Sequence, residues 1–259
     1  MNQSSTWLRR LERMMFRARP ALEAVEYDGW VLRFADGYTK RANSVNPHFG
    51  SSLPVSAKIA HCEALYAERG LPTIFRLTPF SQPGPLDVTL ERAGYGTLDP
   101  TLVMTASLNS SADIETGSVC HLSGEEWFPA YNSLRTLEPA HQKAHRRIVE
   151  SADCACCFAA ILQEKEPIAC GLGILVDDAV GLFDLYAATS HRRLGYGRAI
   201  VSSIIQWALH QGAHIGFLQV HSKNTSARSL YEQFGFSTAY RYWYRIQPEP
   251  YGTAVPEER

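Results

Sequence analysis

The feature that most constrains this chain is a glycine-containing turn between a strand-like run and a helix-like run. Residues 180–188 are mostly β-branched, aromatic and aliphatic, whereas residues 199–209 repeat apolar side chains at helical spacing. The turn between them, residues 192–198, contains Gly195 and Gly197. Glycines let backbone N–H groups approach a ligand closely, and the free amides and positive dipole end of the following helix attract an anion. The pattern predicts a phosphate-binding turn.

This turn differs from two other phosphate-binding patterns. It lacks the Gly-Lys-Ser/Thr end of a Walker loop. It also lacks the third glycine of a dinucleotide fingerprint and the acidic residue that should follow about 20 positions on. Arginines within the turn add fixed positive charge that suits a pyrophosphate.

A second motif follows the turn. Residues 218–221 alternate like a strand and lead into a helix-like segment. The residues of this motif, in the spacing N-x-x-A-x-x-L-Y-x-x-x-G-F, are Asn224, Ala227, Leu230, Tyr231, Gly235 and Phe236. Together with the R-x-x-G-x-G turn, the motif resembles the GNAT acyltransferases across residues 119–245. The resemblance implies an α/β (α+β) GNAT fold, with a mixed central sheet flanked by helices, and acetyl-CoA or another acyl-CoA as cofactor.

The resemblance also implies roles for particular residues. It places a backbone N–H of the preceding strand at the thioester carbonyl and a general acid at Tyr231, whose phenol has a reference pKa near ~10. The alternative for Tyr231 is an aromatic side chain in the core. The resemblance also implies that Asn224 lies near the cofactor, and Asn224 is an expected helix N-cap as well. The implied cofactor residues are Tyr186, Ala187, Ala188, Arg192, Arg193, Leu194, Gly195, Tyr196, Gly197, Arg198 and Asn224.

The general base is less defined by the pattern. Asp184 lies in an otherwise apolar strand, where desolvation would raise its pKa. Histidine has an ordinary pKa near neutrality, which makes His221 at the end of the next strand a candidate, and Glu138 is a candidate on the acceptor side. Each of these is otherwise a strand-edge or surface polar group, and a water chain is a further alternative. His191 and Arg193 are equally consistent with solvated turn residues.

The order of expected elements occurs twice along the chain, which suggests two GNAT-like units in tandem. We expect an abbreviated, degenerate unit at residues 1–108, a linker at 109–117, a catalytic unit at 118–247 and a disordered tail at 248–259. Residues 43–50 occupy the place of the glycine turn in the first unit, with one glycine and no arginine, and Leu90 takes the place of Tyr231. The cofactor is therefore expected to bind the second unit alone.

Composition excludes several other classes of function. The net charge is −1 with no Lys/Arg block, which argues against nucleic acid as a partner. No apolar run approaches about 18 residues, so no membrane span is expected. The basic, amphipathic residues 7–19 lack the features of a secretory signal, and we expect a first helix packed on its own unit. A transit peptide or membrane-surface helix is the alternative.

The six cysteines do not follow zinc-ligand spacing, so we expect no metal site. We expect them to be structural thiols, which is consistent with a reducing cytoplasm. No arrangement of a Cys or Ser nucleophile with an activating base is evident, so we expect no covalent intermediate. The expected function is direct acyl transfer to a primary amine, on a small molecule or a peptide, by a monomer or homodimer. Two alternatives stay open: transfer of a longer acyl group to a Lys/ornithine-type side chain, and a non-catalytic acyl-CoA-binding regulatory module.

Overall fold

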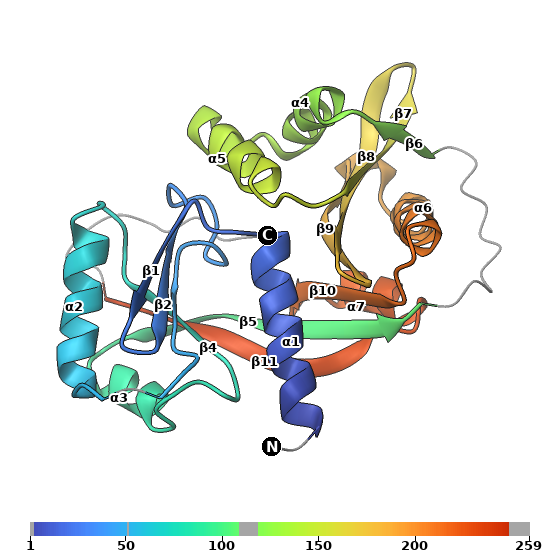
Figure 1. Cartoon of the computed structure of the whole chain (residues 1–259). Helices are drawn as coiled ribbons and strands as arrows, with labels where there is room; N and C mark the ends of the chain where they lie inside the picture. Colours follow the sequence, from blue (N-terminus) through green and yellow to red (C-terminus); the bar gives the residue numbers. More distant parts are fainter. Residues whose placement is uncertain (1–2, 51, 109–118, 249–259) are drawn as a thin grey trace. The chain divides into compact units, whose positions relative to one another are not determined.

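The computed structural model describes residues 3–50, 52–108 and 119–248 of the 259-residue chain. They form two compact units (Figure 1). The large unit comprises residues 3–20, 102–108 and 119–239, and the small unit comprises residues 21–50, 52–101 and 240–248. The expected linker at 109–117 lies outside the described residues, as does the expected tail apart from Pro248.

The large unit is a mixed sheet flanked by helices. Its strand order is β5-β10-β9-β8-β7-β6, in which β6 to β9 pair antiparallel and β9 pairs parallel with β10. The elements are α1 (Gln3–Ala18), the second half of β5 (Gly96–Ser107), β6 (Val119–Leu122), α4 (Gly124–Arg135), α5 (Pro139–Glu150), β7 (Cys156–Gln163), β8 (Glu166–Val176), β9 (Ala179–Ala187), a 3-10 turn (Thr189–His191), α6 (Tyr196–His210), β10 (Ile215–His221) and α7 (Thr225–Glu232). This architecture confirms the expected fold class.

Helix α6 packs directly on strand β8 because two glycines remove the side chains between them. A Cβ at Gly171 would lie 2.4 Å from Ile200 Cγ2, and one at Gly173 would lie 2.4 Å from Ile204 Cγ2. Side chains alternate along a strand, so the buried Leu172 between these glycines points to the opposite face, where α1 and α4 pack on β8 (Figure 1). Both faces of the sheet are therefore covered.

Helix α1 packs within the large unit. Its apolar side is buried and includes Leu11, Met14 and Met15. On its polar side, Arg17 pairs with Asp177 at 2.7 Å and Arg10 pairs with Asp178, both in the β8–β9 turn. The sequence predicts that this helix packs within the N-terminal unit, whereas the structure joins it to residues far along the chain. The sequence does not foresee this because ion pairs over such separations leave no local pattern.

The small unit has its own sheet and core. The strand order is β1-β2-β3-β4-β11-β5, and a separate apolar cluster centres on Trp30, Phe75 and Tyr66. The elements are β1 (Glu23–Tyr27), β2 (Trp30–Phe34), β3 (Val45–Asn46), α2 (Val55–Ala67), β4 (Ile74–Leu77), α3 (Leu86–Arg92), the first half of β5 and most of β11 (Ser237–Ile246). Strands β5 and β11 each contribute residues to both units, so the grouping differs from the expected boundaries at both ends.

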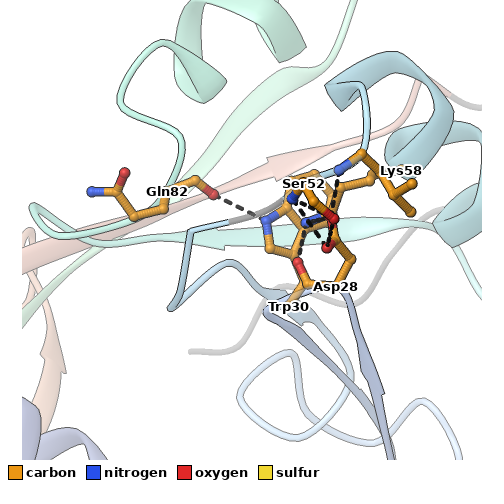
Figure 2. Close-up of polar contacts among 6 residues, drawn as sticks. Asp28, Trp30, Ser52, Lys58 and Gln82 are labelled. Atoms are coloured by element: carbon orange, nitrogen blue, oxygen red, sulfur yellow. Dashed lines mark hydrogen bonds and ion pairs between the residues drawn. The ribbon is translucent and has the colours of Figure 1, made fainter.

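Within the small unit, an aspartate binds the backbone of the segment before α2 and pairs with a buried lysine (Figure 2). The Asp28 carboxylate accepts hydrogen bonds from the N–H groups of Ser52 at 3.1 Å and Leu53 at 3.0 Å. Lys58 Nζ lies 3.3 Å from the same carboxylate and 3.9 Å from the centre of the Trp30 ring. Hydrogen bonds from the backbone hold the pKa of Asp28 well below its usual range, and burial lowers the pKa of Lys58.

None of the helices in the described ranges is long and apolar enough to cross a membrane.

Candidate active site

Strand β9 carries a β-bulge in the middle of the large unit. Cys170 pairs with Tyr186 and Leu172 pairs with Phe183, so two residues of β9 lie opposite one residue of β8. Asp184 is the first of these two, and its φ of 51° is left-handed. A bulge of this kind bends the strand and breaks the regular ladder. The structure thus supplies the local irregularity that the sequence alone does not reveal.

The two parallel strands at the centre of the sheet separate at the same level. Pairing of β9 with β10 runs from Ala179 and Ile215 to Leu182 and Leu218. Strand β9 continues to Ala187 and β10 to His221, but the paired register in the described chain ends before the bulge. After Leu182, the backbone N–H and C=O groups of β9 that face β10 are therefore outside the paired register of these two strands.

The direction of each amide in β9 follows from the remaining pairing with β8. Ala188 N–H donates to the carbonyl of Ile168 at 2.9 Å. In an antiparallel ladder the residues that bond to the neighbour alternate, so Tyr186 also faces β8 and Ala187 faces away from it. Arg192 Nε reaches the carbonyl oxygen of Ala187 at 3.4 Å on that far side. Of the three residues that the resemblance implies, Ala187 is the one whose N–H points to the side where β10 has left.

The glycine turn forms the start of helix α6. Gly195 is the N-cap residue with a left-handed φ of 86°, and its carbonyl accepts from Ala199 N–H at 3.0 Å. The first N–H groups of a helix have no partner within it and carry the positive end of the dipole. The seven turn residues are contiguous here, and most are exposed; they are Arg192, Arg193, Leu194, Gly195, Tyr196, Gly197 and Arg198.

Two guanidinium groups flank Tyr186 at the end of β9. Arg192 lies 5.6 Å from the centre of the Tyr186 ring, with Nη2 3.5 Å from its hydroxyl, and Arg135 at the end of α4 lies 5.3 Å from the same centre. A guanidinium over an aromatic face is attracted by the ring quadrupole. Positive charge therefore gathers beside the separated strands. The sequence does not single out Arg135, because its place depends on the packing of α4.

The second motif lies against the turn. Asn224 is the N-cap of α7, since its Oδ1 accepts from Ala227 N–H at 3.1 Å, which confirms the capping prediction. A Cβ at Gly197 would lie 3.3 Å from Leu230 Cδ2, so α7 and the turn are in contact. Tyr231 is 8% exposed and joins the core cluster of the large unit, with its ring centre 6.1 Å from that of Phe236. Its role as general acid stays a prediction.

Asp184 has a different environment from the one that the sequence predicts. Its carboxylate accepts from Arg19 Nη2 at 2.8 Å and lies 2.9 Å from His145 Nε2, with the Tyr131 hydroxyl at 3.4 Å. Burial alone would raise its pKa, but Arg19 and His145 outweigh burial and hold the pKa well below the usual range. The expectation of a raised pKa is therefore wrong. An isolated polar residue in an apolar strand signals buried partners, but the sequence does not say which ones.

The other candidate residues have different partners in the structure. His221 ends β10, where its Nδ1 accepts from Lys223 N–H at 3.2 Å. Glu138 is the exposed N-cap residue of α5. His191 lies in the 3-10 turn, with Nε2 3.1 Å from Gln163 Oε1.

The cysteines remain thiols in the structure, and burial raises the pKa of most of them. The pKa of Cys156 rises to about 11, and those of Cys62, Cys157 and Cys170 rise to about 12. Within the described residues, no group of three or more His, Cys, Asp or Glu side chains is arranged to hold a metal ion.

The chain is similar in fold and in sequence to several known proteins. A solved structure, "GCN5-related N-acetyltransferase from Kribbella flavida", superposes with a TM-score of 0.68 over 96% of this chain and 97% of that one, at 14% identity. In sequence, the chain is 29% identical over 246 residues to "Uncharacterized N-acetyltransferase YobR" of Bacillus subtilis, covering 93% of this chain and 98% of the relative. It is 24% identical over 233 residues to "Probable histone acetyltransferase Rv0428c" of Mycobacterium tuberculosis, covering 88% of this chain and 70% of the relative.

The fold is that of the GNAT acetyltransferases. The family model described as "Probable histone acetyltransferase Rv0428c C-terminal" matches residues 5–245. The chain belongs to this family, and it is an acyl-CoA-dependent acyltransferase of the GNAT type.

Proposed function

We propose that the large unit transfers an acetyl or longer acyl group from acyl-CoA to a primary amine, directly and within a ternary complex. One observation carries this proposal. The glycine turn, the bulge and the separation of β9 from β10 occur together in one unit, next to the helix that carries Tyr231.

The turn fits the phosphates of the cofactor. Gly195 places the free amides of the first turn of α6 at an exposed surface, and Arg192 and Arg198 supply positive charge there. A pyrophosphate gains charge-assisted hydrogen bonds from such groups. When bound, acyl-CoA supplies the activated thioester for the reaction.

The Ala187 N–H is the proposed donor to the thioester oxygen. The amine nitrogen attacks the carbonyl carbon and forms the C–N bond, and negative charge develops on the oxygen. A fixed amide donor stabilises that charge without reorganisation, which is the effect of an oxyanion hole. The C–S bond then breaks, and the electron pair leaves on sulfur.

Proton transfers complete the reaction: the ammonium loses one proton before attack, the nitrogen loses a second once the C–N bond has formed, and the thiolate gains one. Tyr231 is the proposed general acid, which protonates the leaving thiolate. The acceptor ammonium must lose a proton before attack, because a lysine-like amine has a pKa near ~10.4. Asp184 does not suit that task, since a carboxylate with a strongly lowered pKa is a weak base. His221, Glu138 or a water chain is the better candidate.

Direct transfer is supported by the state of the thiols. A covalent acyl-cysteine would need a thiolate, and burial raises the pKa of Cys156, Cys157 and Cys170 in the large unit. These thiols are protonated at neutral pH and poorly suited to attack a thioester.

The small unit is proposed to bind no acyl-CoA. The N–H groups that precede α2 already hydrogen-bond to the Asp28 carboxylate, and Lys58 neutralises that charge (Figure 2). An internal carboxylate therefore satisfies the donors that a phosphate would need. This contact supports the proposal that the first unit is degenerate.

The acceptor is proposed to be a small-molecule or peptide amine, and the site of action the cytoplasm, for a monomer or homodimer. Two alternatives are tested alongside. One is transfer of a longer acyl group to a Lys/ornithine-type peptide side chain. The other is a non-catalytic acyl-CoA-binding module, for which the turn would suffice without Tyr231.

A thiol-release assay on the whole protein tests these functions. Acetyl-CoA and longer acyl-CoAs are each combined with a panel of amino acids, polyamines and lysine- or ornithine-containing peptides. Amine-dependent release of CoA, with the acylated amine detected by mass, supports transfer. Calorimetric binding of acetyl-CoA without release for any amine supports the binding module.

A further inference from the structure

We propose that Arg19, from the segment after α1, and His145, from α5, are positioning residues that hold the β9 bulge through Asp184 and thereby orient the Ala187 amide. This inference rests on the proposed function of the large unit. It adds a requirement for Arg19, which lies outside residues 119–245, the region that carries the two sequence motifs.

The bulge needs support because Asp184 has an unfavourable backbone conformation. Its φ of 51° lies in the left-handed region, which residues other than glycine adopt at a cost in free energy. Aspartate tolerates this region better than most residues, yet such strain persists only where the surroundings determine it. Asp184 is contacted from three places in the chain: by Arg19 after α1, by Tyr131 on α4 and by His145 on α5.

Arg19 makes two contacts with the bulge. Its Nη2 donates to Asp184 Oδ1 at 2.8 Å, and its guanidinium carbon lies 5.1 Å from the centre of the Phe183 ring. The Arg19 and Asp184 side chains are only 11% and 10% exposed. Removing one partner of such a pair leaves a buried charge uncompensated, which is strongly unfavourable.

His145 holds the carboxylate from the α4–α5 side. Its side chain is fully buried, its Nε2 lies 2.9 Å from Asp184 Oδ2, and its ring packs 5.0 Å from that of Tyr131 on α4. The two carboxylate oxygens are thus bound by groups from different parts of the chain. The bulge cannot relax without breaking one of these contacts.

The extra residue in β9 decides which amide faces the open side. With the bulge, Ala188 pairs with Ile168 and Ala187 faces away from β8. Without it, the register would shift by one residue, and the Ala187 N–H would point at Ile168 instead. The proposed donor to the thioester therefore exists only while the bulge is held.

The chain offers a matched control for Arg19. Arg17, two residues earlier, pairs with Asp177 at 2.7 Å, but those side chains are 56% and 51% exposed. This pair has the same chemistry at a neighbouring place in the chain, and it lies at the β8–β9 turn rather than at the bulge. Exposed pairs contribute little to stability.

The test compares Arg19→Ala, Arg19→Lys, His145→Ala and Arg17→Ala in the whole protein. For each, kcat and KM are measured with acetyl-CoA and the best amine, acetyl-CoA binding is measured by calorimetry, and folding is followed by thermal unfolding. We expect Arg19→Ala and His145→Ala to lower kcat by about 10²-fold, the usual cost of a small misplacement at the reacting centre. Acetyl-CoA affinity should change less than about threefold, because the glycine turn is a separate structure. Arg19→Lys should restore part of kcat, and Arg17→Ala should match the wild type.

Three outcomes would overturn the proposal. One is a folded Arg19→Ala variant with wild-type kcat, and another is a loss of kcat that Arg17→Ala reproduces. The third is parallel loss of kcat and acetyl-CoA affinity, which would indicate a general structural role. If Arg19→Ala does not fold, Arg19→Lys decides the matter by the same split between kcat and affinity. Absence of transfer by the wild-type protein would instead overturn the proposed function itself.

Discussion

The N–H of Ala188 donates to the carbonyl oxygen of Ile168 at 2.9 Å. This bond holds the end of β9 to β8 and fixes the alternation of amides along β9. Ala187 consequently faces the side from which β10 has separated. The relationship identifies one amide among the three residues that the family resemblance implies.

The first prediction removes that amide. Proline has no N–H, and Ala187→Pro deletes the proposed donor without breaking a hydrogen bond to β8. We expect kcat to fall by about 10²–10³-fold, the cost of losing one oxyanion donor. Ala187→Gly, which keeps the N–H, is the control and should stay near wild type. Steady-state kinetics with acetyl-CoA checks the pair, and equal kcat values for the two variants would contradict the role of this amide.

The second prediction concerns the glycine turn and uses both ends of α6. Gly195 and Gly212 have φ values of 86° and 84°, and a Cβ at either would meet no atom within 4 Å. Gly195→Val and Gly212→Val should therefore cost similar stability, about 1–2 kcal/mol for the left-handed conformation. Only Gly195→Val should abolish acetyl-CoA binding, because its side chain enters the space that the pyrophosphate needs. Thermal unfolding and calorimetry separate the two effects, and unchanged affinity in folded Gly195→Val would make the turn merely structural.

Much of the fold was accessible from local patterns. The glycine turn of α6 and the cap of α7 depend on residues that are close in sequence, and both are present. The fold class follows from the family resemblance that these two motifs carry, and each motif spans only a few neighbouring residues.

The remaining features depend on contacts over long separations. Arg19 and Asp184 are 165 residues apart, and nothing local to either residue indicates the other. The same limit explains why the sequence suggests a raised pKa for Asp184: burial is visible in an apolar strand, but the compensating cation is not. The same limit explains why the sequence does not predict that helix α1 belongs to the large unit.

The third prediction concerns pH and the small unit. The pKa of Asp28 is lowered in the folded state, so its contribution to stability is present above its unfolded pKa of ~3.9 and is lost as pH falls below that value. Asp28→Asn keeps an acceptor oxygen but loses the charge beside Lys58. Its Tm should be lower than that of the wild type at pH 7, and the difference should shrink below about pH 4. A difference that is constant with pH would show that the charge is not responsible. Acetyl-CoA affinity should not change, because the proposed binding site lies in the large unit.

The fourth prediction separates catalysis from packing at Tyr231. Tyr231→Phe keeps the ring that packs near Phe236 in the core of the large unit and removes only the hydroxyl. We expect kcat to fall by about 10²–10⁴-fold, the range for loss of a positioned general acid, with little change in Tm or acetyl-CoA affinity. Tyr66→Phe is the opposite control, because its buried hydroxyl donates to the Arg33 carbonyl at 2.9 Å in the small unit. That variant should lose about 0.5–1.5 kcal/mol of stability and keep wild-type kcat. If Tyr231→Phe instead lowers Tm and leaves kcat unchanged, Tyr231 is a core aromatic and the thiolate takes its proton from solvent.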